Sequence, residues 1–413
     1  MRIWLINHYA VPTRYYPLAR SAAFAKYLLR AGHEVTIFAA STVHNADLNL
    51  IPDGSLYRED TVDGIPYVYV RDIDYRGNGL RRIVNMLLFP PNLGRVVRRF
   101  PKPDVILAVS ATPMACMKGL KLARRYGCKG IAEIADLWPE SFVAYGLMGS
   151  QNPLLKLMYA YEARLYRNAH AIVFTMEGGR KYLEGRGWRS GGSGSRDLDK
   201  VFHINNGVDL EAFDSDRDHA AYEDADLDDP DTFKAVYTGA IRKSNGLSML
   251  VDTAQALTRR GRNDIRLILF GDGDERVVLE AEAGKRGLRN ILFKGKVDKR
   301  AIPAILARAD LCLLHWQPSP IEKYGMSMNK QFDYFAAGKP VLANTKTAYD
   351  LIDQYRCGIS QTLTTADAYA DAICFFADMD AAQRQEYGNN ARKAAQEYDF
   401  AKLTEKLMEV IKP

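Results

Sequence analysis

The sequence contains no uninterrupted apolar stretch of the ~18 residues that a membrane-spanning helix requires. Residues 1–9 pass from a short apolar run straight into turn-forming residues, whereas a secretory signal needs a longer apolar region and a cleavage site of small residues. These two absences lead us to expect a cytoplasmic protein. They leave open a peripheral position at the inner face of the cell membrane.

Paired cysteines and clustered metal ligands are also lacking. The five cysteines show no paired spacing, which argues against a disulfide framework and a zinc site; they are Cys116, Cys128, Cys312, Cys357 and Cys374. Asp-x-Asp pairs occur in segments expected to be loops, and we interpret them as solvated; they are Asp72/Asp74, Asp214/Asp216, Asp224/Asp226 and Asp378/Asp380. We therefore expect neither a metal nor a cofactor.

One segment lacks acidic residues altogether. Between Arg76 and Lys102, seven basic residues and no acid flank the apolar run 83–89. Basic and apolar residues side by side attract an anionic membrane surface, so peripheral membrane contact is one interpretation. The alternative is a helix with a core stripe and a solvated basic face. Base-stacking aromatic residues are not interleaved with these charges, so nucleic acid is not an expected partner.

What the sequence does contain is a regular alternation of strands and helices. Its 413 residues, 47% apolar and 26% charged, suit a globular protein with two domains of roughly 200 residues each. A strand at 2–6, a periodic helix at 21–30 and a strand at 34–39 make a β-α-β unit, which builds a parallel sheet. Further strands are expected at 68–70, 105–109, 130–134, 171–174, 235–237, 266–270, 291–293, 311–314 and 340–343, and further helices at 248–259, 274–286, 301–308 and 328–336.

The fold class that follows is α/β, with two facing, doubly wound Rossmann-like domains. The Gly/Ser-rich stretch 190–195 lies near the domain boundary, so we place the domains at 1–198 and 199–395. A last helix, at about 396–413, has no strand after it and is able to pack back on the first domain. Ligands of such sheets bind at the carboxyl ends of the strands, so we expect the site in an inter-domain cleft.

A glycine-bracketed loop in the second domain is the first candidate for chemistry. A strand ends at Gly239, a loop with Arg242 and Lys243 follows, and a helix starts after Gly246. Backbone N–H groups at a helix start, with cations nearby, suit a diphosphate. A plain strand-to-helix turn is the common alternative.

A second turn contains Gly271 and Gly273. It lacks the G-x-G-x-x-G spacing of a dinucleotide fold, which weakens a dehydrogenase hypothesis. We interpret the acids that follow, Asp274 and Glu275, as helix-capping residues, while the two glycines border the ligand.

The segment 324–341 is the most informative. Asn329 and Asp333 are four residues apart and share a helix face. Lys330 lies in the first turn, where a cation is unfavourable against the helix dipole unless an anion binds there. A sugar diphosphate would supply that anion, and Asp333 would accept hydrogen bonds from the ribose hydroxyls. The alternative is an amphipathic helix with a solvated Lys and Asp.

These segments, in this order, resemble glycosyltransferase family 4, whose members are retaining enzymes of the GT-B fold. The resemblance spans nearly the whole chain and is carried by residues 7–9, 32–35, 136–141, 206–209, 239–246, 271–273 and 329–340. Within this family, the chain especially resembles bacterial O-antigen and capsular polysaccharide transferases of the N-acetyl-fucosamine transferase type.

The resemblance implies a retaining hexosyl- or N-acetylhexosaminyltransferase. Its donor would be a nucleotide-sugar with uracil as the base, bound by the domain 199–395. Its acceptor would be a polyprenyl-linked saccharide, bound by the domain 1–198. Two alternatives stay open: a sugar-nucleotide epimerase on the same scaffold, and a non-catalytic two-domain sugar-binding protein.

The chain departs from the family pattern at Ala135, Ala240, Asn245, Gly325 and Asp333. Many members carry an Arg where this chain has Ala240, a Lys where it has Asn245, and a histidine where it has Ala135. They also carry a pair of glutamates at the positions of Gly325 and Asp333. The charge of the diphosphate must then be met by other cations, and the candidates are Arg242, Lys243 and Lys330.

The candidate site residues fall into three groups. Catalytic candidates are Lys330, Arg242, Asp136 and His8, although Asp136 could instead cap a turn and His8 could be structural. Donor-binding candidates are Gly239, Lys243, Gly271, Gly273, Asn329, Asp333, Lys296 and Val297. Candidates in a loop facing the acceptor or the diphosphate are Tyr9, Pro17 and Arg20.

Overall fold

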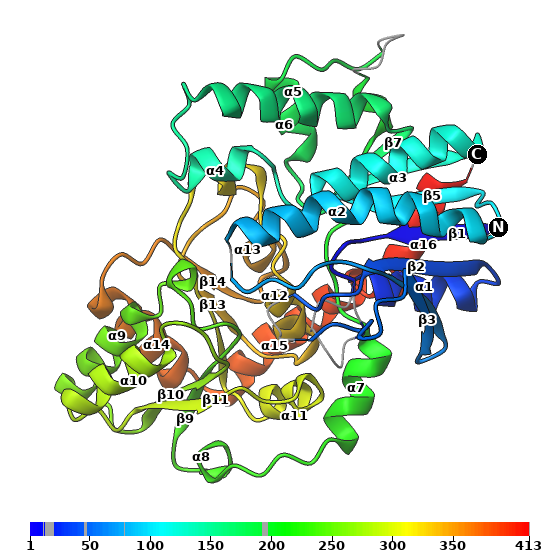
Figure 1. Ribbon diagram of the computed structural model, residues 1–413. Coiled ribbons are helices and arrows are strands. Elements are labelled where there is room, and N and C mark those ends of the chain that lie inside the picture. Colours follow the sequence, from blue (N-terminus) through cyan, green and yellow to red (C-terminus); the bar gives the residue numbers. More distant parts are fainter. Residues whose placement is uncertain (11, 13–19, 45–47, 78, 192–196, 413) are drawn as a thin grey trace. The chain divides into compact units, whose positions relative to one another are not determined.

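Figure 1 shows the computed structural model of the chain, which describes residues 1–10, 12, 20–44, 48–77, 79–191 and 197–412. The chain forms two units, Met1–Asn205 together with Phe400–Pro413, and Asn206–Asp399. It passes from one to the other at Asn205–Asn206 rather than at 198–199. Within the described ranges, no helix combines the length and the apolar character needed to cross a membrane.

The first unit is built on an eight-stranded sheet in the order β3-β4-β2-β1-β5-β6-β7-β8, parallel except for the pair β3–β4. Its central strands are apolar runs because both faces of a parallel sheet are covered by helices; all five residues of β5 are buried. The strands are β1 (Arg2–Ile6), β2 (Glu34–Ala40), β3 (Tyr57–Val62), β4 (Ile65–Val70), β5 (Val105–Val109), β6 (Lys129–Ile134), β7 (Ala171–Phe174) and β8 (Val201–His203).

The helices of the first unit lie on two sides of this sheet. From β1 the chain moves first towards β2 and later towards β5 and β6, so right-handed crossovers place the connecting helices on opposite faces. α1 (Arg20–Arg30) packs with α16 (Phe400–Ile411), and the rings of Phe24 and Phe400 are 5.4 Å apart. On the other face α3 (Pro113–Tyr126) lies between α2 (Leu80–Val96) and α5 (Pro153–Asn168) (Figure 1). Shorter elements are α4 (Glu140–Ala144), α6 (Gly179–Gly185), η1 (Val97–Arg99) and η2 (Leu198–Lys200).

The second unit has a six-stranded parallel sheet in the order β11-β10-β9-β12-β13-β14. Along β9, Ala235 and Tyr237 face one core cluster and Val236 faces the other, as the two-residue period of a strand requires. The strands are β9 (Phe233–Thr238), β10 (Ile265–Phe270), β11 (Ile291–Gly295), β12 (Leu311–Leu314), β13 (Val341–Ala343) and β14 (Gly358–Ser360).

Helices cover both faces of the second sheet as well. The cluster of Ala235 and Tyr237 is closed by α9 (Ser248–Arg259), α10 (Arg276–Lys285) and α14 (Ala366–Asp378). The cluster of Val236 is closed by α7 (Leu210–His219), α11 (Ile302–Ala307), α12 (Asn329–Ala336), α13 (Leu351–Tyr355) and α15 (Ala381–Glu397). Remaining short elements are α8 (Ala225–Asp228), η3 (Lys243–Asn245), η4 (Lys299–Ala301) and η5 (Pro320–Tyr324). The structure thus confirms the expected pair of doubly wound α/β sheets.

One element of the first unit differs from the expectation. The strand expected at 68–70 is the end of a longer strand, β4, which forms an antiparallel hairpin with β3. The hairpin turns at Asp63 and Gly64, both with positive φ (52° and 75°). An Asp-Gly pair between two segments of alternating apolar and polar residues is the sequence pattern of such a two-residue turn. The hairpin could therefore have been predicted from the sequence.

We expect Gly179→Ala, at the first residue of α6, to destabilise the first unit. A Cβ there would lie 2.1 Å from Cγ of Phe174 in the core strand β7, so the core is overpacked, at a cost of about 1–3 kcal/mol. Gly185→Ala, at the other end of α6, is the control: its Cβ meets nothing within 4 Å, so it should be neutral or stabilising. Urea unfolding of both variants checks this. Equal unfolding midpoints would contradict the packing argument.

Candidate functional site

Two glycine turns lie side by side at the carboxyl ends of β9 and β10. Gly239 and Gly271 have φ values of 143° and 145°, which residues with a side chain rarely adopt. A Cβ on Gly271 would lie 1.8 Å from the Gly239 carbonyl oxygen, and one on Gly273 would lie 2.2 Å from that of Ile241. The structure therefore brings these three predicted glycines together in a turn pair that admits no side chain.

The helix that carries Lys330 is fixed to the end of β9. The buried hydroxyl of Tyr334 on α12 accepts a hydrogen bond from the backbone N–H of Thr238 at 2.9 Å. It also lies 3.2 Å from the carbonyl oxygen of Leu313 in β12. This anchor sets α12 so that its first turn lies beside the glycine turns.

Lys330 is half-buried, and its ammonium lies against an aromatic ring. Its Nζ donates to the Tyr237 hydroxyl at 2.8 Å and lies 4.2 Å from the ring centroid. A Cβ on Gly239 would lie 2.9 Å from this Nζ, so the glycine makes room for it. Desolvation lowers the pKa of Lys330 to about 7. Among the described residues Lys330 forms no ion pair, which leaves its charge for an external anion.

Asp333, one turn further along α12, has a protein partner. Its carboxylate accepts a hydrogen bond from Lys299 Nζ at 2.7 Å, and its side chain is 15% exposed. The carboxylate is therefore ordered rather than solvated, and it retains acceptor positions for hydroxyl groups. Asn329 is exposed at the helix start.

The other donor-side candidates occupy the loops around these turns. Arg242 and Lys243 are exposed and, within the described part of the chain, make no ion pair. Lys296 follows β11 and is exposed, whereas Val297 is half-buried and packs on the core. These cations lie on loops that follow β9 and β11, so they share the carboxyl edge of the sheet with Lys330.

A buried histidine at this edge was not among the predicted site residues. His315 directly follows β12 and is 3% exposed. Its Nδ1 donates to the Asn245 carbonyl oxygen at 2.7 Å, which fixes the loop 239–246. Burial lowers the pKa of His315 to about 4, so the ring is neutral. A polar residue directly after a predicted strand was the available sequence signal, the same one that singled out His8.

His8, a catalytic candidate, is completely buried in the first unit. Its Nε2 lies 2.8 Å from Oδ1 of Asn85, whose Nδ2 donates to Thr42 and Ile73, so the His8 proton is on Nε2. Desolvation lowers the pKa of His8 to about 4, and burial raises the pKa of nearby Asp72 to about 8. This placement favours the structural interpretation of His8. It also corrects the expectation that Asp72 is solvated.

Arg20 does not present a free cation to a diphosphate. Its guanidinium donates to the carbonyl oxygens of Ile204 and Asn205, at 2.8 Å and 2.5 Å, and its Nε lies 3.1 Å from buried Glu133. It therefore ties the start of α1 to the residues after β8.

The remaining first-unit candidates differ in exposure. Tyr9 is 7% exposed, stacks on His44 and accepts a hydrogen bond from Arg82 at 3.3 Å. Asp136 is exposed two residues after the end of β6, at the carboxyl edge where a cleft residue was expected. Pro17 lies outside the described residues.

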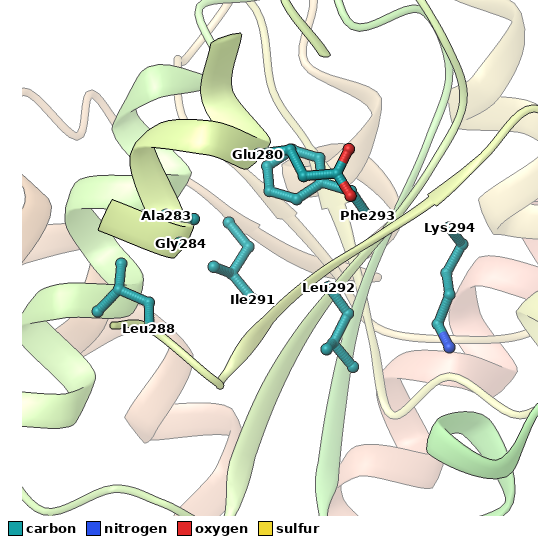
Figure 2. A pocket seen from close by; sticks show the side chains of 8 residues that line it. All are labelled: Glu280, Ala283, Gly284, Leu288, Ile291, Leu292, Phe293 and Lys294. Atoms are coloured by element: carbon teal, nitrogen blue, oxygen red, sulfur yellow. The ribbon is translucent and has the colours of Figure 1, made fainter. Parts of the chain in front are cut away.

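A cavity of about 300 Å³ lies elsewhere, on the edge strand of the second sheet (Figure 2). It is lined by Glu280, Ala283, Gly284, Leu288, Ile291, Leu292, Phe293 and Lys294, from α10, β11 and their connection. The Lys294 ammonium is already paired with Asp224 and Asp226. None of the candidate site residues lines it, so its size alone does not make it the functional site.

Comparison with known proteins identifies two family domains. "Glycosyltransferase Family 4" matches residues 21–212, and "Glycosyl transferases group 1" matches residues 221–394. The putative colanic acid biosynthesis glycosyl transferase WcaI of Escherichia coli strain K12 is 25% identical over 70% of each chain. Alpha-D-kanosaminyltransferase of Streptomyces kanamyceticus is 29% identical over 33% of this chain and 34% of that enzyme. These matches favour a transferase over the epimerase and sugar-binding alternatives.

Solved structures show the same fold. The Anabaena protein Alr3699/HepE, in complex with UDP, superposes with a TM-score of 0.68 at 17% identity, over 99% of both chains. A trehalose-6-phosphate protein from E. coli, bound with UDP-2-fluoro glucose, has a TM-score of 0.74 at 12% identity, over 100% of this chain and 99% of that one. With two glycosyltransferase domains on doubly wound α/β sheets, this chain belongs to the glycosyltransferases of family 4 and has the GT-B fold.

Proposed function

We propose that this glycosyltransferase is a retaining enzyme that moves a sugar from UDP to a lipid-linked saccharide in the synthesis of a bacterial surface polysaccharide. The observation that carries the donor part is the Lys330 ammonium, desolvated beside the Gly239 turn and without a carboxylate partner in the described ranges. The colanic acid enzyme among the relatives supports the polysaccharide, and the neighbours solved with UDP or a UDP-sugar support the nucleotide.

In the proposed reaction the bond between the anomeric carbon and the diphosphate oxygen breaks first. Positive charge develops on the sugar, and negative charge on the leaving diphosphate. Lys330 and the backbone N–H groups at the start of α12 stabilise that negative charge, and Arg242 and Lys243 add to it from the loop. The acceptor hydroxyl then bonds to the anomeric carbon on the face the diphosphate left. Because the new bond forms on that same face, the configuration is retained, and the diphosphate takes the hydroxyl proton.

The acceptor part rests on the segment 76–102. Its basic residues flank apolar side chains of α2, of which Leu80 is 80% exposed. A lipid-linked acceptor would be reached at a membrane surface, and such a segment suits peripheral contact with anionic lipid. A nucleotide-sugar donor and a lipid-linked saccharide are thus the two proposed partners.

We expect Lys330→Ala to lower turnover by ~10²–10³-fold, because it removes one preorganised charge opposite the leaving diphosphate. Release of UDP from a UDP-sugar in the presence of acceptor measures this. Lys285→Ala, an exposed lysine on α10, is the matched control and should leave the rate unchanged. An unchanged rate in Lys330→Ala would remove Lys330 from the site.

UDP binding should be coupled to proton uptake by Lys330. The pKa of the free enzyme's Lys330 is about 7, and a bound diphosphate raises it, so between the two values the complex holds more protons. Affinity for UDP should therefore fall as the pH rises above about 7 and be level below it. Calorimetry at pH 8 in buffers of different ionisation enthalpy measures the uptake. Lys330→Met should abolish it, and an identical uptake in this variant would assign the proton to another group.

We expect Asp333→Ala to weaken UDP binding by ~10–100-fold, the effect of losing hydrogen bonds to a charged group. Lys299→Met is the informative companion, because it frees the Asp333 carboxylate without removing it. If Asp333 contacts the ribose, Lys299→Met should retain most of the affinity. Equal losses in both variants would mean that the ion pair shapes the site and that Asp333 does not touch the nucleotide.

A further inference from the structure

Exposed apolar side chains gather on one side of α2. In the described part of the chain sixteen large apolar residues are exposed, and half of them lie in residues 80–88 and 147–157. Those of α2 recur every three or four residues and form a stripe on the side opposite its buried residues; they are Leu80, Ile83, Val84, Leu87 and Leu88. α2 therefore has two apolar faces, and only one of them packs on the first unit.

A second exposed patch lies at the start of α5. Leu147, Leu154 and Leu157 are 70%, 50% and 66% exposed. Crossover helices run against the parallel strands they connect, so α2 and α5 both begin at the carboxyl edge of the sheet, with α3 between them (Figure 1). The two patches thus share one edge, the edge where Asp136 follows β6.

The same three helices carry almost no acid. Glu162 is the one acidic residue in α2, α3 and α5, and it is buried, where it accepts hydrogen bonds from Tyr166 and Tyr182. Exposed cations are numerous on these helices and on η1; they are Arg81, Arg95, Arg98, Arg99, Lys121, Arg124, Arg125, Lys156, Arg164 and Arg167. Within the described ranges none of them pairs with a carboxylate.

The surface of the second unit is the useful contrast. On α10, Arg276 pairs with Asp272 and Glu280, and Arg286 pairs with Asp252 and Glu282. Paired surface charges of this kind exert little electrostatic attraction on a charged partner.

The unpaired cations are close enough to repel one another. Burial together with the positive charges of Lys121, Arg125 and Arg98 lowers the pKa of Lys118 on α3. The Lys118 side chain lies against Gly94 of α2, where a Cβ would be 2.3 Å from its Nζ. Like charges held together without a counter-charge are relieved by an anionic partner.

We propose that α2, α3 and α5 form one docking face for an anionic lipid bilayer. The two leucine patches insert between the headgroups, and the cations of the three helices contact the lipid phosphates. A bilayer explains both features of the face, because a nucleic acid would use the cations but not the exposed leucines. This inference rests on the proposed lipid-linked acceptor and extends the membrane contact beyond the segment 76–102. Asp136 would then lie at the lipid surface, so the acceptor need not leave the bilayer.

The charge part is tested by flotation of the full chain with vesicles of phosphatidylcholine, with or without phosphatidylglycerol. The wild type should bind the anionic vesicles at low salt and be released at high salt. Lys121→Gln/Arg125→Gln on α3 should lower the affinity by roughly thirtyfold, the effect of two surface cations. The matched control is Lys285→Gln/Arg289→Gln in the second unit, which should bind like the wild type.

The apolar part is tested at the second patch. Leu154→Gln/Leu157→Gln should lower vesicle affinity by about tenfold or more, because two apolar side chains no longer leave water. Val277→Gln/Val278→Gln is the matched control: both valines are exposed on α10, at 68% and 66%, outside the proposed face. Each variant should unfold in urea at the wild-type midpoint, which shows that the unit carrying the substitutions is folded.

Three outcomes would overturn the docking face. The first is equal binding of the wild type to neutral and anionic vesicles. The second is wild-type affinity in both the α3 and the α5 variants. The third is binding of an oligonucleotide as tight as that of the vesicles and weakened by the same variants. Retained UDP binding without vesicle binding would reject the face alone, whereas vesicle binding without UDP or UDP-sugar binding would reject the proposed function alone.

Discussion

The second unit is organised around a half-buried ammonium group that, among the residues the structure describes, has no carboxylate to balance it. Lys330 is held by the ring and the hydroxyl of Tyr237, and that hydroxyl in turn donates to the Ala240 carbonyl oxygen. Burial raises the pKa of Tyr237, so the phenol stays protonated and adds no negative charge. Desolvating a cation in this way disfavours its charged form, and a bound diphosphate would reverse that penalty. Gly239 is part of the same constraint, because any side chain there would displace the ammonium.

Most of the fold could be predicted because parallel strands are covered on both faces and therefore appear as short apolar runs. The hairpin at Asp63–Gly64 was not predicted although its turn residues are typical, because β3 is mostly polar and does not form an apolar run. In the second unit the glycines were identified from their place in turns that follow predicted strands. That place did not show why glycine is needed, which is the contact of the Gly271 turn with the Gly239 carbonyl group.

The candidate side chains were harder to place than the turns. Strand-end position selected His8, and a place just before the first helix selected Arg20. Their partners Asn85 and Glu133 are far away in sequence, and no local pattern reveals such pairs. The same rule applied to β12 would have selected His315, which holds the loop that carries Arg242 and Lys243. Local sequence thus predicts which residues reach the carboxyl edge of a sheet. Whether a side chain stops there or turns into the core depends on contacts made by distant segments.

Charge is distributed between the two units in a way that the net charge of +6 conceals. On α10 the arginines are matched by acids in the same or a neighbouring turn, so their net field is small. Ten exposed cations of α2, α3, α5 and η1 form no ion pair within the described ranges, and only the pattern of ion pairs shows which of the many basic residues of the chain remain unneutralised. In the second unit Lys330 is likewise a cation that forms no ion pair among the described residues. Unpaired positive charge, rather than positive charge as such, is therefore the feature that distinguishes the surfaces and sites expected to meet phosphate.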